Sequence, residues 1–377
     1  MKKLVVLMLL LGIAVVAFSQ QRPRMSDDLK KVSILRKVQR MADPVKSADP
    51  VQFTPGTNFK SAGMLGDETT IIETIYDLQS NACLSNRFWR WDDGTMAAVC
   101  TRGVEQPSLT GFPDRGTGYN YFNGAEWGPM PTARIESERS GWPNIAPWGE
   151  NGEIVVSHTS TNLKINRRTT KGQGAWEELP PYEGPGGTCD PVWPRIAASG
   201  ENNQYTHLFY NSYNPYEGQT NALLYSRSSD GGHTWEIQDM VIDEIGPDYY
   251  FGITADEYVL ASRGDKLVLF CASSWYDLFI LESEDNGDTW EKTIIWEHPY
   301  PFFDIMTDFF DDTLCLPDNS GQVAIDANGM VHVAFAVNRV LRDESHEPGY
   351  LTSFPYWDGI AYWNENMETP IPEHPDN

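Results

Sequence analysis

Two short segments of this chain share one pattern of five residues. The first consists of Ser228, Asp230, Gly232, Thr234 and Trp235, and the second of Ser283, Asp285, Gly287, Thr289 and Trp290. Each lies between two strand-like apolar stretches, which is the organisation of a β-hairpin closed by a tight turn. In such a turn the aspartate accepts backbone N–H groups, the glycine supplies a positive φ, and the tryptophan covers the hairpin. The repetition predicts an all-β protein built from similar units.

Weaker copies of the pattern precede the two complete ones. Residues 168–176 align with 227–235 without a gap and keep the tryptophan, and residues 119–127 are a more distant relative. The tryptophans that end the four segments are Trp127, Trp176, Trp235 and Trp290. They follow one another at intervals of roughly 50 to 60 residues, which is typical of a β-propeller blade with long loops.

A second hairpin is expected upstream in each unit. Turn sequences rich in Gly, Asn and Asp stand between apolar runs at residues 91–94, 150–152, 200–203, 263–265 and 326–329. Two hairpins per unit make a four-stranded blade. The predicted fold is therefore a β-propeller of five four-stranded blades, beginning near residues 86, 142, 192, 256 and 321. Six is the alternative count, if residues 300–318 form a divergent blade.

Closing the ring requires a strand from the far terminus or a fourth strand in the last blade. Residues 70–78 contain several β-branched residues and are predicted to be a strand suited to that role. Residues 359–364 of the fifth unit resemble residues 118–123 of the first. The propeller is assigned to residues 67–377.

The N-terminal part of the chain differs from the repeats. Lys2 and Lys3, the apolar run 4–16 and the small-residue site at 17–19 predict a signal peptide over residues 1–19, cleaved near Ser19. Residues 20–66 are predicted to be an arm and linker, with an amphipathic helix over 27–41. We therefore expect a secreted or cell-surface protein. No later run reaches the ~20 apolar residues of a spanning helix, so membrane insertion is not expected.

The charge and the cysteines restrict the partners further. The chain has 53 Asp and Glu against 28 Lys and Arg, a net charge of −25 that disfavours nucleic acid and anionic lipid. The five cysteines are odd in number, and none are at zinc-ligand spacing, so neither a structural metal nor a cofactor is expected. Ca²⁺ is the one cation to consider, at an acidic run that is otherwise a solvated loop. This run consists of Asp304, Asp308, Asp311, Asp312 and Asp318.

With these motifs at blade spacing, the chain resembles the Asp-box (BNR-repeat) propellers, best known from sialidases, and uncharacterised exported bacterial propellers. The resemblance covers about residues 67–370. It implies that both complete motifs lie on turns between the two outer strands of a blade, on the face away from the ligand. Their residues are therefore expected to be structural.

The ligand face is expected where the inner strands begin and the second strands end. The candidate ligand-binding residues there are Arg87, Asn144, Arg195, Trp275, Tyr276, Asn338 and Arg339. Arginine pairs with carboxylates in a bidentate manner and aromatic rings stack on sugar rings, so these side chains suit a sugar or a carboxylated sugar. The alternative is structural: the arginines hydrogen-bond to neighbouring blades, and Trp275 and Tyr276 pack between blades.

The resemblance also bears on catalysis. Sialidases use three arginines, a Tyr–Glu pair and an Asp, and their first arginine lies in an Arg-Ile-Pro motif. Residues 86–89 of this chain depart from that motif, and the Tyr–Glu pair is not assignable; Arg87, Arg195 and Arg339 are the candidate triad. Three functions stay open. An exported propeller that binds a glycan or another extracellular ligand is favoured, a glycoside hydrolase is the first alternative, and an adhesive or structural surface protein is the second.

Overall fold

A computed structural model describes residues 68–80, 86–105, 111–186, 189–300, 302–310, 312–354 and 359–371, together with the backbone of 34–37. The predicted signal peptide and most of the predicted arm lie outside these residues. The described chain is made of strands and loops with three short 3₁₀ turns, at Glu201–Asn203, Asp243–Ile245 and Ala255–Glu257. The described residues contain no helix with the length and apolar character needed to span a membrane.

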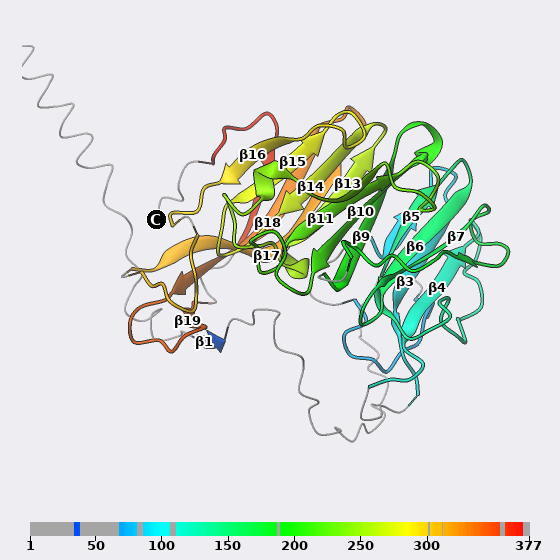
Figure 1. Cartoon of the computed structure of the whole chain (residues 1–377), viewed down its shortest axis with the longest axis horizontal. Coiled ribbons are helices and arrows are strands. Elements are labelled where there is room, and N and C mark those ends of the chain that lie inside the picture. Colours follow the sequence, from blue (N-terminus) through cyan, green and yellow to red (C-terminus); the bar gives the residue numbers. More distant parts are fainter. Residues whose placement is uncertain are drawn as a thin grey trace, which may run out of the picture.

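The described strands form five antiparallel sheets that follow one another along the chain (Figure 1). Sheet 1 contains β2 (Phe88–Arg90), β3 (Met96–Arg102) and β4 (Gly116–Phe122). Sheet 2 contains β5 (Gly141–Trp148), β6 (Gly152–His158), β7 (Leu163–Arg168) and β8 (Glu177–Glu178). Sheet 3 contains β9 (Pro191–Ser199), β10 (Tyr205–Ser212), β11 (Leu223–Ser228) and β12 (Ile237–Val241). Sheet 4 contains β13 (Tyr258–Arg263), β14 (Lys266–Cys271), β15 (Leu278–Ser283) and β16 (Glu291–Trp296).

Sheet 5 has a different composition. Its main strands are β17 (Leu314–Ile325), β18 (Val331–Leu341) and β20 (Gly359–Asn364), and β19 (Tyr350–Ser353) and β1 (Ile34–Lys37) extend it beyond one end of β18. The prediction of an all-β chain of antiparallel sheets is confirmed, and sheets 2 to 4 have the four strands expected of each unit. The first strands of the sheets begin within a few residues of the predicted unit starts, apart from β17, which begins earlier than residue 321.

Each sheet opens with a hairpin whose turn the sequence predicted. The last pairs before the turns are Arg90 with Met96, Trp148 with Gly152, Ser199 with Tyr205, Arg263 with Lys266, and Ile325 with Val331. Gly94, Gly264 and Gly329 in these turns have φ of 84°, 61° and 86°. Glycine adopts this left-handed conformation without a steric penalty, which explains why these turns were recognisable from local sequence.

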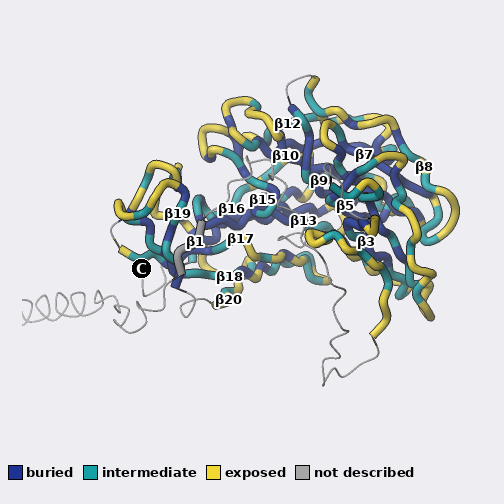
Figure 2. The backbone as a smooth tube through the Cα atoms, turned by 90° about the horizontal axis from the view of Figure 1, so that it is seen from below, coloured by how far each residue is buried: buried dark blue, intermediate teal, exposed yellow. Residues whose placement is uncertain are grey.

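Apolar clusters join each sheet to the next, and the first strands lie closest together. Strand β5 contacts β9, β9 contacts β13, and β13 contacts β17. Strand β6 is buried on both faces: Ile154, Val155 and Val156 are each 0% exposed, because Val155 packs toward sheet 1 and the other two toward sheet 3. Figure 2 shows this buried interior running through the stack of sheets. Such strands appear as continuous apolar runs rather than alternating ones, because neither face meets water.

The two end sheets lie at opposite ends of the row in Figure 1. Each has an apolar residue that faces solvent: Phe88 of sheet 1 is 52% exposed, and Ile360 of sheet 5 is 85% exposed. A closed ring of blades therefore stays a prediction.

Three expectations about the chain outside the repeats are wrong. Residues 34–37, within the predicted helix 27–41, form β1 and pair with β19, because an open strand edge offers backbone partners that a short, isolated helix lacks. Residues 70–78 form no strand; Ile75 donates to Gly103 O at 2.9 Å, and this segment runs beside sheet 1 rather than sheet 5. Residues 302–310 form turns, so the described part of 300–313 contains no strand of a sixth blade.

Candidate functional site

Sheets 2 and 3 begin with the same unusual backbone conformation. Trp142 and Trp193 have φ of 57° and 50°, and each is followed by a proline. This conformation is strained for a large side chain. In both sheets the register of the first two strands shifts at this point, as in a β-bulge. Bulges redirect side chains at strand ends. Here both indoles are half-buried and meet each other, with ring centroids 6.3 Å apart and an interplanar angle of 64°.

Three predicted ligand residues lie beside these two Trp-Pro segments. The guanidinium carbons of Arg87 and Arg195 lie 5.5 and 5.9 Å from the centre of the Trp142 ring. Arg87 also donates to Pro143 O at 2.8 Å, and Arg195 donates to Ala255 O. Asn144 is the equivalent residue of sheet 2, and it donates to Pro194 O at 2.9 Å. Each side chain thus bonds to the carbonyl of the following sheet, which is the structural role considered as an alternative; ligand binding by them stays a prediction.

Two further arginines act, like Arg87, on His158, and sequence reasoning did not bring them together. Arg115 and Arg139 are half-buried and donate to the carbonyls of Ser140 and Phe112, both at 2.9 Å. Within the described residues neither forms an ion pair with a carboxylate. Burial, together with the positive charges of Arg115, Arg139 and Arg87, lowers the pKa of His158 to about 4. The charges of three arginines from three separate segments therefore act on one histidine.

Aromatic rings border these arginines. The Trp193 ring centroid lies 6.1 Å from that of His158 and 6.2 Å from that of Tyr213, which is 39% exposed. On the other side, Arg115 lies over Tyr76 at 5.5 Å. We call Arg87, Arg115, Arg139, His158, Trp142 and Trp193 the arginine–tryptophan cluster. Guanidinium groups bind carboxylates or sulfates, and aromatic faces stack on sugar rings, so this combination is suited to an anionic sugar. The repeated Trp-Pro at the start of two units was the available sequence signal.

Trp275 and Tyr276 lie in the loop between β14 and β15 of sheet 4, and both contact other side chains. Trp275 stacks on Phe303 with centroids 5.4 Å apart and an interplanar angle of 15°. Tyr276 is 9% exposed, and its hydroxyl donates to Glu257 Oε2 at 3.2 Å. Burial raises the pKa of Glu257, although hydrogen bonds from Thr254 N and Ser273 Oγ oppose this shift. A Tyr–Glu contact that the sequence could not assign is therefore present, buried between the turn before β13 and the loop after β14.

The remaining candidates, Asn338 and Arg339, belong to β18 of sheet 5. Asn338 Oδ1 accepts from Ser353 Oγ at 3.1 Å, and Arg339, 3% exposed, donates to Thr313 Oγ1 at 2.9 Å. Sheet 5 lies at the end of the row away from sheet 1 (Figure 1). Arg87 and Arg195 share Trp142, whereas Arg339 is placed apart from them.

The two repeated turns connect the third and fourth strands of sheets 3 and 4. Asp230 accepts from Thr234 N at 2.8 Å, Thr234 Oγ1 at 2.7 Å and Ser228 Oγ at 2.8 Å. Asp285 accepts the equivalent bonds from Thr289 and Ser283, at 2.9, 2.6 and 2.8 Å. Partial burial acts to raise the pKa of Asp230, but these hydrogen bonds hold it at about 2. The antiparallel order of the strands places both turns at the sheet end opposite Trp193.

The acidic run has local partners in the described residues. Asp308 accepts from Asp304 N, Asp312 from Thr313 N, and Asp318 from Ser320 N; Asp311 lies outside the described residues. In the described part of the chain, no group of three or more His, Cys, Asp or Glu is arranged to hold a metal ion.

Comparisons with known proteins give only distant likenesses. No family model matches the chain, and no curated protein matches it. A solved ulvan lyase, a polysaccharide lyase, is 11% identical with a TM-score of 0.42, over 68% of each chain. The six-bladed propeller lectin of Aleuria aurantia is 11% identical with a TM-score of 0.39, over 69% of this chain and 74% of the lectin. A Trypanosoma rangeli sialidase is 13% identical with a TM-score of 0.39, over 69% of this chain and 46% of the sialidase. At such values the likenesses do not identify this chain's ligand.

Proposed function

We propose that this chain is an exported Asp-box propeller that binds an anionic glycan at the arginine–tryptophan cluster, without turnover. One observation carries the proposal. In a protein of net charge −25, Arg115 and Arg139 form no ion pair within the described residues, and the positive charge of Arg115 helps to lower the pKa of Arg139, which burial also lowers. Arginines that repel one another and lack carboxylate partners gain free energy from an anion, and a pair of guanidinium groups is suited to a carboxylate or sulfate.

The aromatic residues beside the arginines indicate that the bound anion is part of a sugar. Trp193 and Tyr213 offer partly exposed rings beside the arginines, and Trp142 lies between Arg87 and Arg195. Aromatic rings cover the C–H faces of pyranoses, while the guanidinium groups hold the acidic substituent. A uronic-acid or sulfated sugar satisfies both requirements.

The experiment is a titration of the folded protein with polygalacturonate, a carboxylated polysaccharide, and with neutral dextran as the matched probe. Binding to polygalacturonate alone is expected, with Arg115→Met and Arg139→Met each weakening it about tenfold or more, on the scale of a lost charged hydrogen bond. Arg263→Met, a change at an exposed turn of sheet 4, is the control and should bind as the wild type does. Equal binding of dextran, or unchanged binding by both cluster variants, contradicts the proposal.

A glycoside hydrolase is the second candidate, and the contact between Tyr276 and Glu257 is the observation that favours it. The test is a panel of fluorogenic glycosides, sialosides included, with and without Ca²⁺. If the wild type releases a sugar and Glu257→Gln does not, while its melting temperature is unchanged, the protein is a hydrolase. The proposal of binding without turnover is then wrong. If neither binding nor release is found with any sugar, the adhesive or structural role is left.

A further inference from the structure

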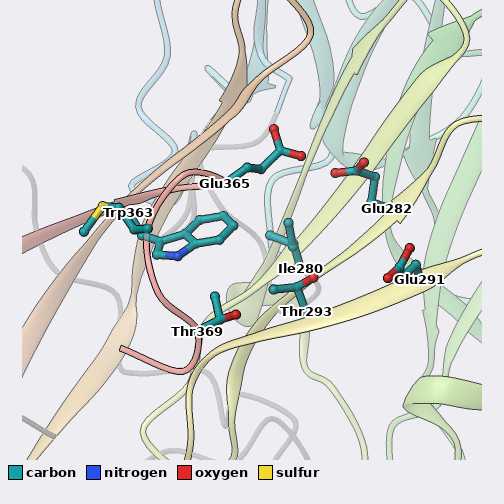
Figure 3. Close-up of a pocket in the computed structure, with 8 residues that line it drawn as sticks. Ile280, Glu282, Glu291, Thr293, Trp363, Glu365 and Thr369 are labelled. Carbon is teal, nitrogen blue, oxygen red and sulfur yellow. The ribbon is translucent and has the colours of Figure 1, made fainter. Parts of the chain in front are cut away.

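A pocket of about 290 Å³ opens between sheets 4 and 5 (Figure 3). Glu282 of β15 and Glu291 and Thr293 of β16 form one side, and Trp363 and Glu365, from β20 and the turn after it, form the other. The carboxylates of Glu282 and Glu365 point toward the same space (Figure 3). Glu282 and Glu291 flank the turn 284–290, so the pocket lies at the sheet end opposite the loops that carry Trp275 and Phe303.

The pocket exists because the part of sheet 5 that carries β20 has three strands, β17, β18 and β20, whereas sheet 4 has four. Beyond β20 no fourth strand follows in the described residues; the chain instead crosses to sheet 4, where Ile371 N donates to Ile295 O at 2.7 Å. The outer strand β16 is therefore covered by a crossing segment rather than by a paired strand. This leaves a polar hollow above Thr293, with Thr369 of the crossing segment on its far side (Figure 3).

The charge of the pocket is negative and only partly compensated. Lys266 Nζ lies 2.9 Å from Glu282, 3.1 Å from Glu284 and 3.2 Å from Glu365. Glu291 is exposed, and its side chain forms no hydrogen bond or ion pair with any described residue. Three carboxylates thus surround one ammonium group, and Glu291 adds a further negative charge to the lining of the pocket. Burial raises the pKa of Glu282 to about 7 in spite of Lys266, which indicates that this carboxylate is under-compensated.

Trp363 supplies an observation independent of the acids. It is 2% exposed, and its Nε1–H donor has no acceptor among the described residues. The indole borders the pocket, with its nitrogen on the ring edge turned toward Thr369 (Figure 3). A buried donor without an acceptor costs about 1–3 kcal/mol, and an occupant with an acceptor oxygen removes that cost.

The two observations define the occupant. It carries a cationic group for the carboxylates, an acceptor oxygen for Trp363, and an apolar face for the indole. A lysine side chain has the cation but no acceptor beside it. A divalent metal ion does not fit, because Lys266 stands among the carboxylates and an N–H group cannot ligate. In an amino sugar, ammonium and hydroxyl groups are neighbours on one ring.

We propose that this pocket binds an amino-sugar unit with a free ammonium group, as in a deacetylated glucosamine oligosaccharide. The ammonium group lies between Glu282, Glu291 and Glu365, and a neighbouring hydroxyl accepts from Trp363 Nε1. The volume is close to the lower end of small-molecule sites, which suits a single ring. The site is separate from the arginine–tryptophan cluster and does not depend on the function proposed there.

The experiment is a calorimetric titration of the folded protein with glucosamine tetrasaccharide and with its fully N-acetylated counterpart, at pH 7. Acetylation removes the charge and keeps the hydroxyls, so the acetylated ligand should bind at least tenfold more weakly. Glu291→Gln and Trp363→Phe should each weaken binding of the free amine by about fivefold or more; the second removes the N–H and keeps an aromatic ring. Glu201→Gln, at an exposed turn of sheet 3, and Arg115→Met should bind as the wild type does.

Three outcomes overturn the proposal. One is equal affinity for the free and acetylated ligands. Another is wild-type affinity in both Glu291→Gln and Trp363→Phe, with melting temperatures confirming that they fold. The third is binding of a tetralysine peptide as tight as that of the amino sugar, which assigns the pocket to basic peptides. Loss of amine binding in Arg115→Met would place the amino sugar at the arginine–tryptophan cluster.

Discussion

Trp142 and Trp193 begin two different sheets, yet their rings lie edge to face with centroids 6.3 Å apart. Each has a positive φ that a tryptophan rarely adopts, so the contact requires backbone strain of order 1–3 kcal/mol per residue. Strain of this kind persists where the surroundings enforce it. Here each tryptophan belongs to a β-bulge, and the ladder pairs on both sides of the bulge hold the backbone in place.

Trp193→Ala should weaken binding of polygalacturonate about tenfold, because it removes the ring between His158 and Tyr213. The measurement is the same titration as for the arginine variants, with the melting temperature as a check of folding. Trp127→Ala, at a ring that contacts only Phe122 in the described residues, is the matched control. Unchanged affinity in Trp193→Ala would falsify a stacking role for this residue.

Asp285→Ala should lower the free energy of unfolding by about 2 kcal/mol, because the carboxylate accepts hydrogen bonds from Thr289 and Ser283. Urea unfolding measures the change, and the exposed Asp248→Ala serves as the control. The pKa of Asp285 is lowered by these bonds, so its stabilising contribution is present above pH ~4 and is lost as the pH falls through the folded pKa. The variant should therefore lose less stability than the wild type on acidification below pH 4.

Glu153→Gln should destabilise the protein by about 3 kcal/mol or more. Glu153 is 0% exposed and accepts from Arg168 Nε at 2.6 Å, Gly172 N at 3.0 Å and Tyr119 OH at 2.8 Å. Removing its charge leaves the Arg168 guanidinium, itself 9% exposed, without its ion-pair partner. Glu150→Gln, in the neighbouring exposed turn, should be neutral. A loss below 1 kcal/mol in Glu153→Gln shows that the pair contributes little.

His207 should stay neutral well below pH 6.5. It is fully buried, burial lowers its pKa to about 3, and its ring contacts Ser199 Oγ at 2.7 Å and Tyr225 OH at 2.9 Å. Because the unfolded imidazole takes up a proton near pH 6.5 and the folded one does not, stability declines as the pH falls from about 6.5 toward 3. His207→Gln should show a shallower decline, whereas His233→Gln, at a half-exposed ring, should match the wild type. A titration of the His207 ring between pH 8 and 5 in NMR spectra contradicts this account.

The hairpins were predictable because their signals are local. The turn glycines, the alternation of apolar runs and the aspartates of the repeated turns act on residues only a few positions away. The same locality explains the error at residues 27–41: apolar spacing of about four residues is compatible with a helix, but the backbone of 34–37 pairs with β19, more than three hundred residues further along the chain.

The sequence by itself determined that this chain is all-β, that its strands pair in successive antiparallel hairpins, and that residues near 87, 144 and 195 occupy equivalent positions in three units. Only the tertiary structure decided which side chains meet. Arg87, Arg115 and Arg139 come from three segments, and their approach to His158 depends on how sheet 1 packs against sheet 2. The acidic pocket likewise depends on β20 being the outer strand of its part of sheet 5, beside the four strands of sheet 4. Periodicity along a strand records which face is apolar, but not the angle and distance at which two such faces pack, and those set the chemistry of both sites.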